Sequence, residues 1–120
     1  MKFDHVVISA GDLAASVRWY DAVLTAIGFA KTREHVWVNA QGEAVDVRAA
    51  TAPDHAYVRG GAGVNHIGFA APSREAVEAV AERLRHAGLD VPAIQSFDEA
   101  RALFMKDPDG LRIEIGHEPV

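Results

Sequence analysis

The chain opens with the stretch FDHVVIS at residues 3–9, and a similar stretch, VNHIGFA, recurs at residues 64–70. Each stretch is rich in apolar residues, carries one histidine at its third position and precedes a helical pattern. His66 lies 61 positions after His5. Because equivalent residues of a repeat occupy equivalent places in a fold, the sequence predicts two copies of one structural module.

The first module reads as one strand, one helix and three further strands. Gly11 and Asp12 follow the first strand as a break and a helix N-cap, and Gly28 ends the helix as a C-terminal glycine. Three extended segments come next, at residues 29–33, 34–39 and 43–50. The order βαβββ is therefore expected over residues 1–50.

The second module repeats this order over residues 64–120. Pro72 and Ser73 begin a helix that Gly88 ends. Strands are expected at residues 91–94 and 102–106, and at 111–116 after the turn Asp107-Pro108-Asp109-Gly110. Between the modules, residues 51–63 hold Pro53 and three glycines, which predicts a linker that can bend or exchange modules between chains. The fold class is α+β.

Composition excludes several classes of protein. Hydrophobic residues make up 49% and charged residues 24% of the 120 residues, which is typical of a globular chain rather than a disordered or fibrous one. The net charge is −5 without a basic stripe, which argues against a nucleic-acid partner. No apolar run reaches the roughly eighteen residues of a membrane span and no leader begins at Met1, so we expect a cytoplasmic protein without a membrane partner.

Alternation along the strands predicts which polar side chains share a face. Four candidates each lie opposite an apolar pair of their own strand: His5, His66, Asp46 and Glu114. The chain has no cysteine, so His, Asp and Glu are its only strong metal ligands. We therefore predict that two histidines and one carboxylate, His5, His66 and Glu114, bind one metal ion. The competing interpretation is that each is an ordinary solvated surface residue.

The sequence resembles the vicinal oxygen chelate superfamily, which includes glyoxalase I, extradiol dioxygenases, fosfomycin-resistance proteins and bleomycin-binding proteins. The resemblance covers almost the whole chain and is carried by residues 3–8, 19–24, 65–69 and 107–114, of which the last, DPDGLRIE, is the most specific. It implies a single glyoxalase-like domain over residues 1–120. In such a domain, two modules form a cupped mixed sheet with helices on its outer face, around a divalent metal.

The resemblance implies that His5, His66 and Glu114 are the ligands of that metal, which is Zn, Ni, Mn or Fe. Glyoxalase-type members carry a fourth ligand, a glutamate, where this chain has Asp46, and this is a departure from their pattern. Asp46 is either a fourth ligand or the ion-pair partner of Arg48 or Arg112.

A divalent ion with open positions can chelate two vicinal oxygens of a substrate and stabilise an enolate, while Glu114 or Asp46 removes a proton. Arg48 either holds a substrate carboxylate or neutralises Asp46, and Phe104 either lines the pocket or belongs to the core. We expect a metal-dependent lyase or isomerase, with an iron-dependent dioxygenase and a non-catalytic drug-binding resistance protein as alternatives. The expected partners are a small-molecule substrate and a second copy of the chain, in a homodimer with sites at or near its interface.

Overall fold

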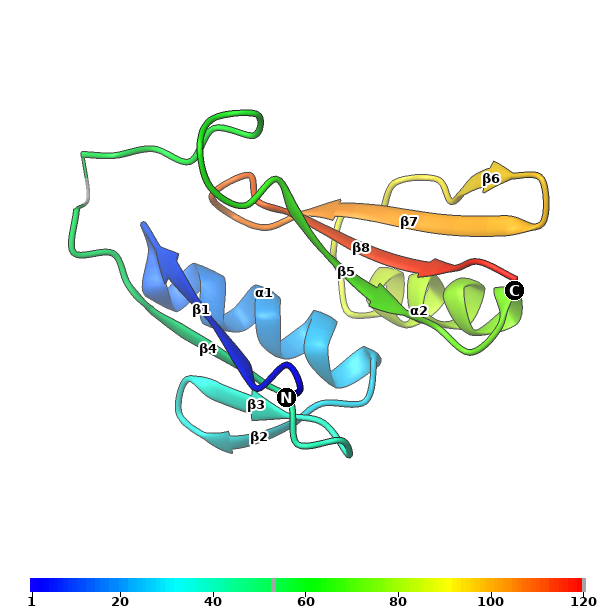
Figure 1. Ribbon diagram of the computed structural model, residues 1–120, viewed down its shortest axis with the longest axis horizontal. Coiled ribbons are helices and arrows are strands. Elements are labelled where there is room, and N and C mark those ends of the chain that lie inside the picture. The colour runs from blue at the N-terminus through cyan, green and yellow to red at the C-terminus, as the bar shows by residue number, and fades with distance from the viewer. Residues whose placement is uncertain (53, 120) are drawn as a thin grey trace. The chain divides into compact units, whose positions relative to one another are not determined.

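The structure, a computed structural model, describes residues 1–52 and 54–119, and the chain divides into two units, Met1–Ala56 and Tyr57–Val120 (Figure 1). Pro53 of the expected linker lies outside the described residues. The first unit contains one helix and four strands: β1 (His5–Ala10), α1 (Leu13–Ala26), β2 (Ala30–Arg33), β3 (Val36–Val38) and β4 (Ala44–Ala49).

The second unit repeats the same order of elements, so the two predicted βαβββ modules are confirmed. Its elements are β5 (His66–Ala70), α2 (Arg74–His86), β6 (Gln95–Phe97), β7 (Ala100–Lys106) and β8 (Arg112–His117). Among the described residues, neither helix has the length and apolar character needed to cross a lipid bilayer.

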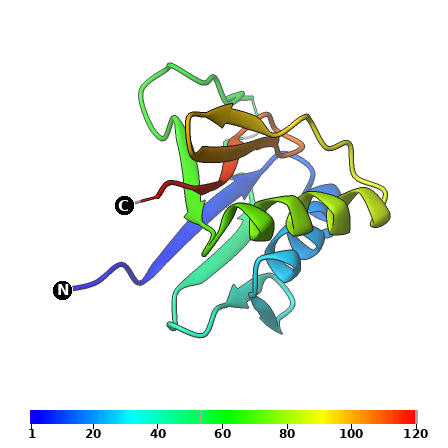
Figure 2. The same cartoon turned by 90° about the vertical axis from the view of Figure 1, so that its right-hand side faces the viewer.

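The two sheets have identical topology. The strand orders are β1-β4-β3-β2 and β5-β8-β7-β6, with the first and last strands of each unit parallel and the other neighbours antiparallel. In each unit the helix packs on one face of the sheet, α1 on β2 and β4, and α2 on β7 and β8 (Figures 1 and 2). We call the opposite face of each sheet its free face.

Helix ends are set by the residues that the sequence indicated. The side chain of Asp12 accepts a hydrogen bond from the Ala15 backbone N–H, and the Ser73 hydroxyl accepts one from that of Ala76. Gly28 and Gly88 follow the two helices with φ of 96° and 85°, in the left-handed region where a side chain would be strained. These local signals fix where each helix begins and ends.

Alternating strand residues form the core on the helix side of each sheet, as predicted. Ile113 and Ile115 of β8 are each 1% exposed, and Val45 and Val47 of β4 are similarly buried. Full burial of such side chains contributes about 1.5–3 kcal/mol each. Trp37 of β3 is also fully buried, and its indole N–H donates a 2.8 Å hydrogen bond to Asp21 of α1.

The DPDG motif is a turn that leads into β8. The carboxylate of Asp107 is buried and accepts hydrogen bonds from the backbone N–H groups of Asp109 and Leu111, each at 2.9 Å. Gly110 completes the turn with φ of 91°. These bonds satisfy the buried carboxylate and fix the direction in which β8 begins.

Two strand predictions were wrong in position. Residues 91–94 do not form a strand; β6 begins at Gln95 and pairs with β7 across a short turn in which Asp98 has φ of 52°. Pro92 lacks the backbone N–H that a strand residue donates to the neighbouring strand. The turn at Asp98 sets the pairing of β6 with β7, so the paired residues are those nearest the turn. Residues 34–35 are likewise a turn between β2 and β3 rather than part of a strand.

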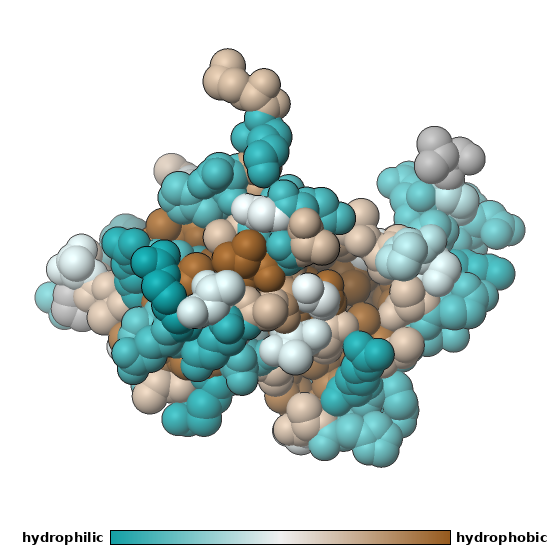
Figure 3. All heavy atoms as spheres, turned by 90° about the horizontal axis from the view of Figure 1, so that it is seen from below, coloured by the Kyte–Doolittle hydropathy of each residue, from teal (hydrophilic) through white to brown (hydrophobic). Residues whose placement is uncertain are grey.

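Hydrophobic residues also reach the surface of the protein, where Figure 3 shows them among hydrophilic ones. Large exposed examples are Phe3 and Val7 in the first unit and Val64 and Phe97 in the second. Val7 and Phe97 belong to β1 and β6, and Val7 shares the free face with the candidate site residues.

Ser16 and Ser73 provide opposite tests of how a hydroxyl contributes to stability. Ser16 lies on α1 and is fully buried, and its hydroxyl has no hydrogen-bond partner among residues 1–52 and 54–119, so Ser16→Ala should raise the free energy of unfolding by about 0.5–1.5 kcal/mol. Ser73→Ala removes the N-cap of α2 and should lower the same quantity by about 1 kcal/mol. Equilibrium urea unfolding measures both. A loss of stability in Ser16→Ala would mean that its hydroxyl is hydrogen-bonded.

Candidate functional site

His5 and His66 occupy the first residue of the first strand of their units. His5 begins β1, His66 begins β5, and both are exposed on the free face. In each sheet this strand is at the edge and pairs in parallel with the last strand of the unit, β4 or β8. The sequence repeat therefore produces equivalent histidine positions, one in each unit.

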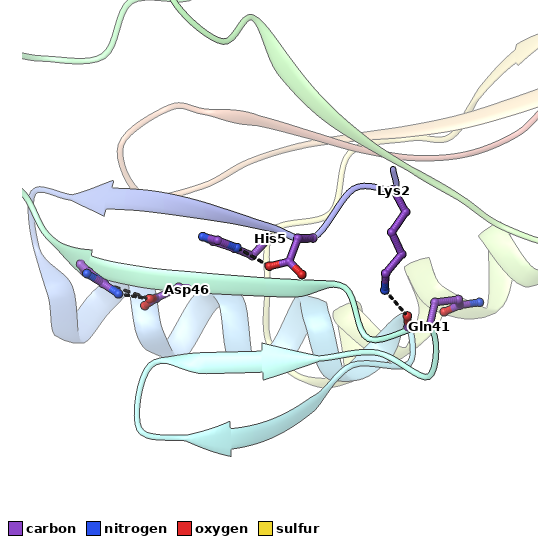
Figure 4. A network of polar contacts seen from close by, with 6 residues as sticks. Lys2, His5, Gln41 and Asp46 are labelled. Carbon is purple, nitrogen blue, oxygen red and sulfur yellow. Dashed lines mark hydrogen bonds and ion pairs between the residues drawn. The ribbon is translucent and has the colours of Figure 1, made fainter.

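The ring of His5 is oriented by the residue before it. Its Nδ1 lies 2.6 Å from a carboxylate oxygen of Asp4 (Figure 4). An ionised carboxylate only accepts hydrogen bonds, so Nδ1 must carry the hydrogen. In the neutral ring this leaves the lone pair on Nε2, which is the form in which imidazole binds a metal ion.

His66 has the same arrangement in the second unit. Its Nδ1 lies 2.9 Å from the side-chain oxygen of Asn65, which can accept a hydrogen bond from Nδ1; in the neutral ring this leaves the lone pair on Nε2. The hydroxyl of Tyr57 lies 2.9 Å and 2.7 Å from the backbone oxygens of Val64 and Asn65. These contacts hold the chain where it enters β5.

Glu114 faces His66 on the free face of the second sheet. One of its carboxylate oxygens, Oε2, lies 3.9 Å from Nε2 of His66. Glu114 is paired with Gly68 on one side and Phe104 on the other. A Cβ atom at Gly68 would stand 3.2 Å from the same Oε2, so the glycine leaves the space that the carboxylate occupies.

This nitrogen–oxygen pair fits a shared divalent ion. Bonds from a metal to imidazole nitrogen and carboxylate oxygen are each about 2.0–2.2 Å, so two such ligand atoms at the tetrahedral angle are about 3.4 Å apart. The 3.9 Å between Nε2 of His66 and Oε2 of Glu114 exceeds this distance by about 0.5 Å. The two side chains would have to move slightly closer to share an ion with tetrahedral geometry.

Asp46 is the counterpart of Glu114 in the first unit, and it is held in an ion pair. The Nε and Nη2 groups of Arg48 donate to one oxygen of Asp46 at 2.9 Å and 2.6 Å (Figure 4). This hydrogen bond and the nearby negative charge raise the pKa of Arg48. Arg48, one of the two arginines considered as partners of Asp46, thus pairs with it inside the first unit.

The two units differ at one further position of the free face. Asp46 is paired with Val7 of β1, whereas Glu114 is paired with Gly68 of β5. A valine side chain therefore stands in the first unit where the second unit has a glycine, beside which Oε2 of Glu114 lies. The repeat has therefore diverged, with a carboxylate that faces the histidine in one unit and a carboxylate paired with arginine in the other.

Phe104 of β7 lies half-buried on the free face, directly beside Glu114. The guanidinium of Arg112 is stacked over its ring, with 4.7 Å between the guanidinium carbon and the ring centroid. Arg112 is paired with His66 on one side and Lys106 on the other. The aromatic ring thus positions an arginine next to the histidine and glutamate pair.

A hollow of about 530 Å³ opens on the free face of the second unit, with Glu114 in its lining. Its floor consists of small residues that the strand register brings side by side: Gly68, Ala70, Gly116 and Ala102. Exposed Phe97 contributes a large apolar side chain to the lining. The hollow thus combines small apolar residues and an aromatic ring with a carboxylate.

Within either unit taken by itself, the described residues gather no group of three or more His, Asp or Glu side chains that could hold a metal ion. The second unit brings together His66 and Glu114. In the first unit, His5 is paired with Asp4, and Asp46 with Arg48. Each unit thus contains part of the predicted ligand set.

Sequence reasoning missed three residues that support the site. Asp4 and Asn65 orient the two histidines, and Gly68 makes room for Glu114. The signal for the first two was present in the repeat, because a side chain with an acceptor oxygen precedes each histidine. The contribution of Gly68 depends on strand register, which the sequence pattern did not give.

Solved structures with a similar fold align with nearly the whole chain. A glyoxylase/bleomycin resistance protein/dioxygenase domain from Frankia sp. EAN1pec has a TM-score of 0.78 and 20% identity, covering 99% of this chain and 93% of that one. A putative glyoxalase from Bacillus halodurans has a TM-score of 0.78 and 21% identity, with 97% and 95% covered. Lactoylglutathione lyase from Agrobacterium tumefaciens has a TM-score of 0.64 and 15% identity, with 97% and 92% covered.

At these identities the structural likeness establishes the fold alone. None of the curated proteins is similar to this chain in sequence. The family model of the Glyoxalase/Bleomycin resistance protein/Dioxygenase superfamily, however, matches residues 2–115. Together with the paired βαβββ modules, this match shows that the chain belongs to the Glyoxalase/Bleomycin resistance protein/Dioxygenase superfamily.

Proposed function

We propose that this protein is a divalent-metal-dependent lyase or isomerase that acts on a small molecule with two vicinal oxygens. The observation that carries the proposal is the 3.9 Å approach of His66 Nε2 to Glu114 Oε2, with the other ring nitrogen of His66 tied to Asn65. A histidine oriented in this way beside a carboxylate is a recurrent arrangement at metal centres.

The proposed ligands are His5, His66 and Glu114. His5 is supported by its equivalence to His66 in the repeat and by the same protonation pattern, with Nδ1 tied to Asp4. Its imidazole comes from the first unit, either of the same chain or of a second copy, so we also propose a cytoplasmic homodimer with sites at or near the interface. The ion is Zn, Ni, Mn or Fe, all of which bind nitrogen and oxygen ligands.

When bound, the ion would polarise the two substrate oxygens and stabilise the negative charge of an enolate. Glu114 would hold the ion, and Asp46 or Glu114 would accept the proton from the carbon next to the polarised carbonyl. Arg48 uses two of its five N–H donors on Asp46. The remaining donors could bind a substrate carboxylate, and Phe104 would contribute an apolar wall.

The donor set also supports a second candidate. Two histidines and one carboxylate are the ligands with which non-haem iron enzymes activate dioxygen, so an iron-dependent dioxygenase uses the same residues. A third candidate, sequestration of an aromatic drug without metal, is supported by exposed Phe97 beside the small-residue floor of the hollow. These three functions predict different behaviour in the same purified protein.

The three functions can be separated without knowing the substrate. A lyase or isomerase should incorporate deuterium from ²H₂O next to the carbonyl of α-hydroxyketones or hemithioacetals, as followed by NMR, and only with metal bound. A dioxygenase should consume dioxygen in the presence of catechols and iron(II). A drug-binding protein should gain thermal stability with planar aromatic compounds, without any metal. The proposal fails if metal-loaded protein shows no deuterium incorporation with either carbonyl class.

Removing either facing ligand should weaken metal binding. We expect His66→Ala and Glu114→Gln each to lower the affinity for Zn²⁺ or Mn²⁺ by more than about tenfold, because each removes a bond to the ion. Isothermal titration of the metal-stripped protein measures this. The matched control is His86→Ala at the end of α2, where the histidine is exposed and paired with Glu82. Equal losses in the control would contradict the assignment.

Replacing the residues that orient the histidines should weaken metal binding nearly as much as replacing a ligand. Asp4→Ala and Asn65→Ala are each expected to reduce metal affinity by about 10-fold to 100-fold, since the ring and its tautomer are no longer fixed. Asp90→Ala, at an exposed position after α2, serves as the control. Unchanged affinity in both variants would mean that the histidines do not bind through Nε2.

Asp46 should affect turnover and not metal affinity. Because Arg48 already holds its carboxylate, we expect Asp46→Asn to keep the affinity for the ion within about twofold of the wild type. Deuterium incorporation should fall if Asp46 accepts the proton. A loss of metal affinity as large as that of Glu114→Gln would instead identify Asp46 as the fourth ligand.

A further inference from the structure

The free face of the second sheet carries a cross-strand row of basic side chains. Strand register places His66 of β5, Arg112 of β8 and Lys106 of β7 next to one another. Arg112 and Lys106 are directly opposed across an antiparallel pair, and like charges in that position destabilise a sheet. Among the described residues of the second unit, no carboxylate oxygen lies within 4.0 Å of the side-chain nitrogens of Arg112 or Lys106.

Phe104 fixes the orientation of the arginine in this row. The guanidinium of Arg112 lies 4.7 Å from the ring centroid, so one planar face is taken up by the aromatic ring. Stacking of this kind leaves the N–H groups at the guanidinium edge available as donors. A planar fork of donors matches the two oxygens of a carboxylate or a phosphate and can bind them bidentately.

The row lies next to the proposed ligand pair. Arg112 is two residues from Glu114 on β8, which corresponds to about 6.6 Å along the strand. Lys106 is likewise two residues from Phe104 on β7. His66 itself belongs to the row, where it is paired with Arg112, whereas Glu114 is two residues further along β8. An anionic group held at this row would therefore lie beside the proposed ligand pair.

We propose that Arg112 and Lys106 form a binding site for an anionic oxygen group of the substrate, a carboxylate or a phosphate. This inference rests on the proposed function, because it identifies the substrate of that site as a small anion whose charged group binds beside the proposed ligand pair. Arg112 binds the group through its guanidinium edge, Phe104 holds the guanidinium in place, and Lys106 adds a second positive charge.

The test uses two simple anions and the whole 120-residue chain without metal. The protein is stripped with a chelator, dialysed into chelator-free Tris–HCl, and titrated separately with inorganic phosphate and with acetate. The ¹H–¹⁵N signals of the Arg112 side chain and of the backbone at residues 104–106 and 112–114 are followed by NMR. Sodium chloride titrated to the same ionic strength controls for general screening.

We expect saturable shifts at Arg112 with one of the two anions, and the anion that binds more tightly identifies the charged group of the substrate. Arg112→Gln should weaken binding by about tenfold, because a charge-assisted bidentate contact is lost. Arg112→Lys should restore only part of the affinity, since it keeps the charge and loses the planar fork. Lys106→Gln should weaken binding by a smaller factor than Arg112→Gln.

Arg85→Gln is the matched control, with the same charge change on α2, where Arg85 pairs with Glu82. Thermal melting of every variant shows whether it remains folded. The proposal is overturned if neither anion produces a saturable shift at Arg112, or if Arg112→Gln and Arg85→Gln bind as tightly as the wild type. Metal titration of the same samples tests the proposed function separately. If the protein binds the ion through His66 and Glu114 but binds neither anion, only the proposed anion site is contradicted.

Discussion

Burial of Ile113 and Ile115 beneath α2 determines where Glu114 can point. These side chains are almost fully excluded from solvent, so β8 cannot rotate or slip by one residue without exposing both of them. The residue between them must then face away from the helix. The same constraint acts on β4, where Val45 and Val47 are buried and Asp46 lies between them. The polar chemistry of each unit is thus positioned by the packing of the opposite face.

The two units of the repeat share their fold but differ in the side chains of their last strands. Both keep a histidine at the start of the first strand, and both keep an acceptor before it that fixes the ring. They differ in the last strand, where Asp46 is bound by Arg48 and Glu114 faces His66. The short side chain of Asp46 forms its ion pair with an arginine two residues away on the same strand. The longer side chain of Glu114 lies beside a glycine and approaches His66 on the neighbouring strand.

Much of this organisation could be predicted from the sequence, because it depends on local rules. Asp12, Ser73, Gly28 and Gly88 have strong preferences at helix ends, and alternation assigned the candidate side chains to the free face. The position of β6 could not be predicted, because it depends on a turn at Asp98 that pairs it with β7. Contacts between strands, such as Arg112 on Phe104 and Gly68 beside Glu114, require the register as well as the pattern.

Gly68 is a position where a substitution would affect the Glu114 side chain more than the fold. Its backbone is not in the left-handed region, so other residues can be built at this position without straining the strand. What a side chain there would disturb is the carboxylate across the ladder, and that carboxylate contributes nothing to the buried core. The surroundings of Glu114 and the packing of the core can therefore change independently at this position. A single substitution at residue 68 would alter the space around the Glu114 carboxylate and leave the buried side chains of the second unit in place.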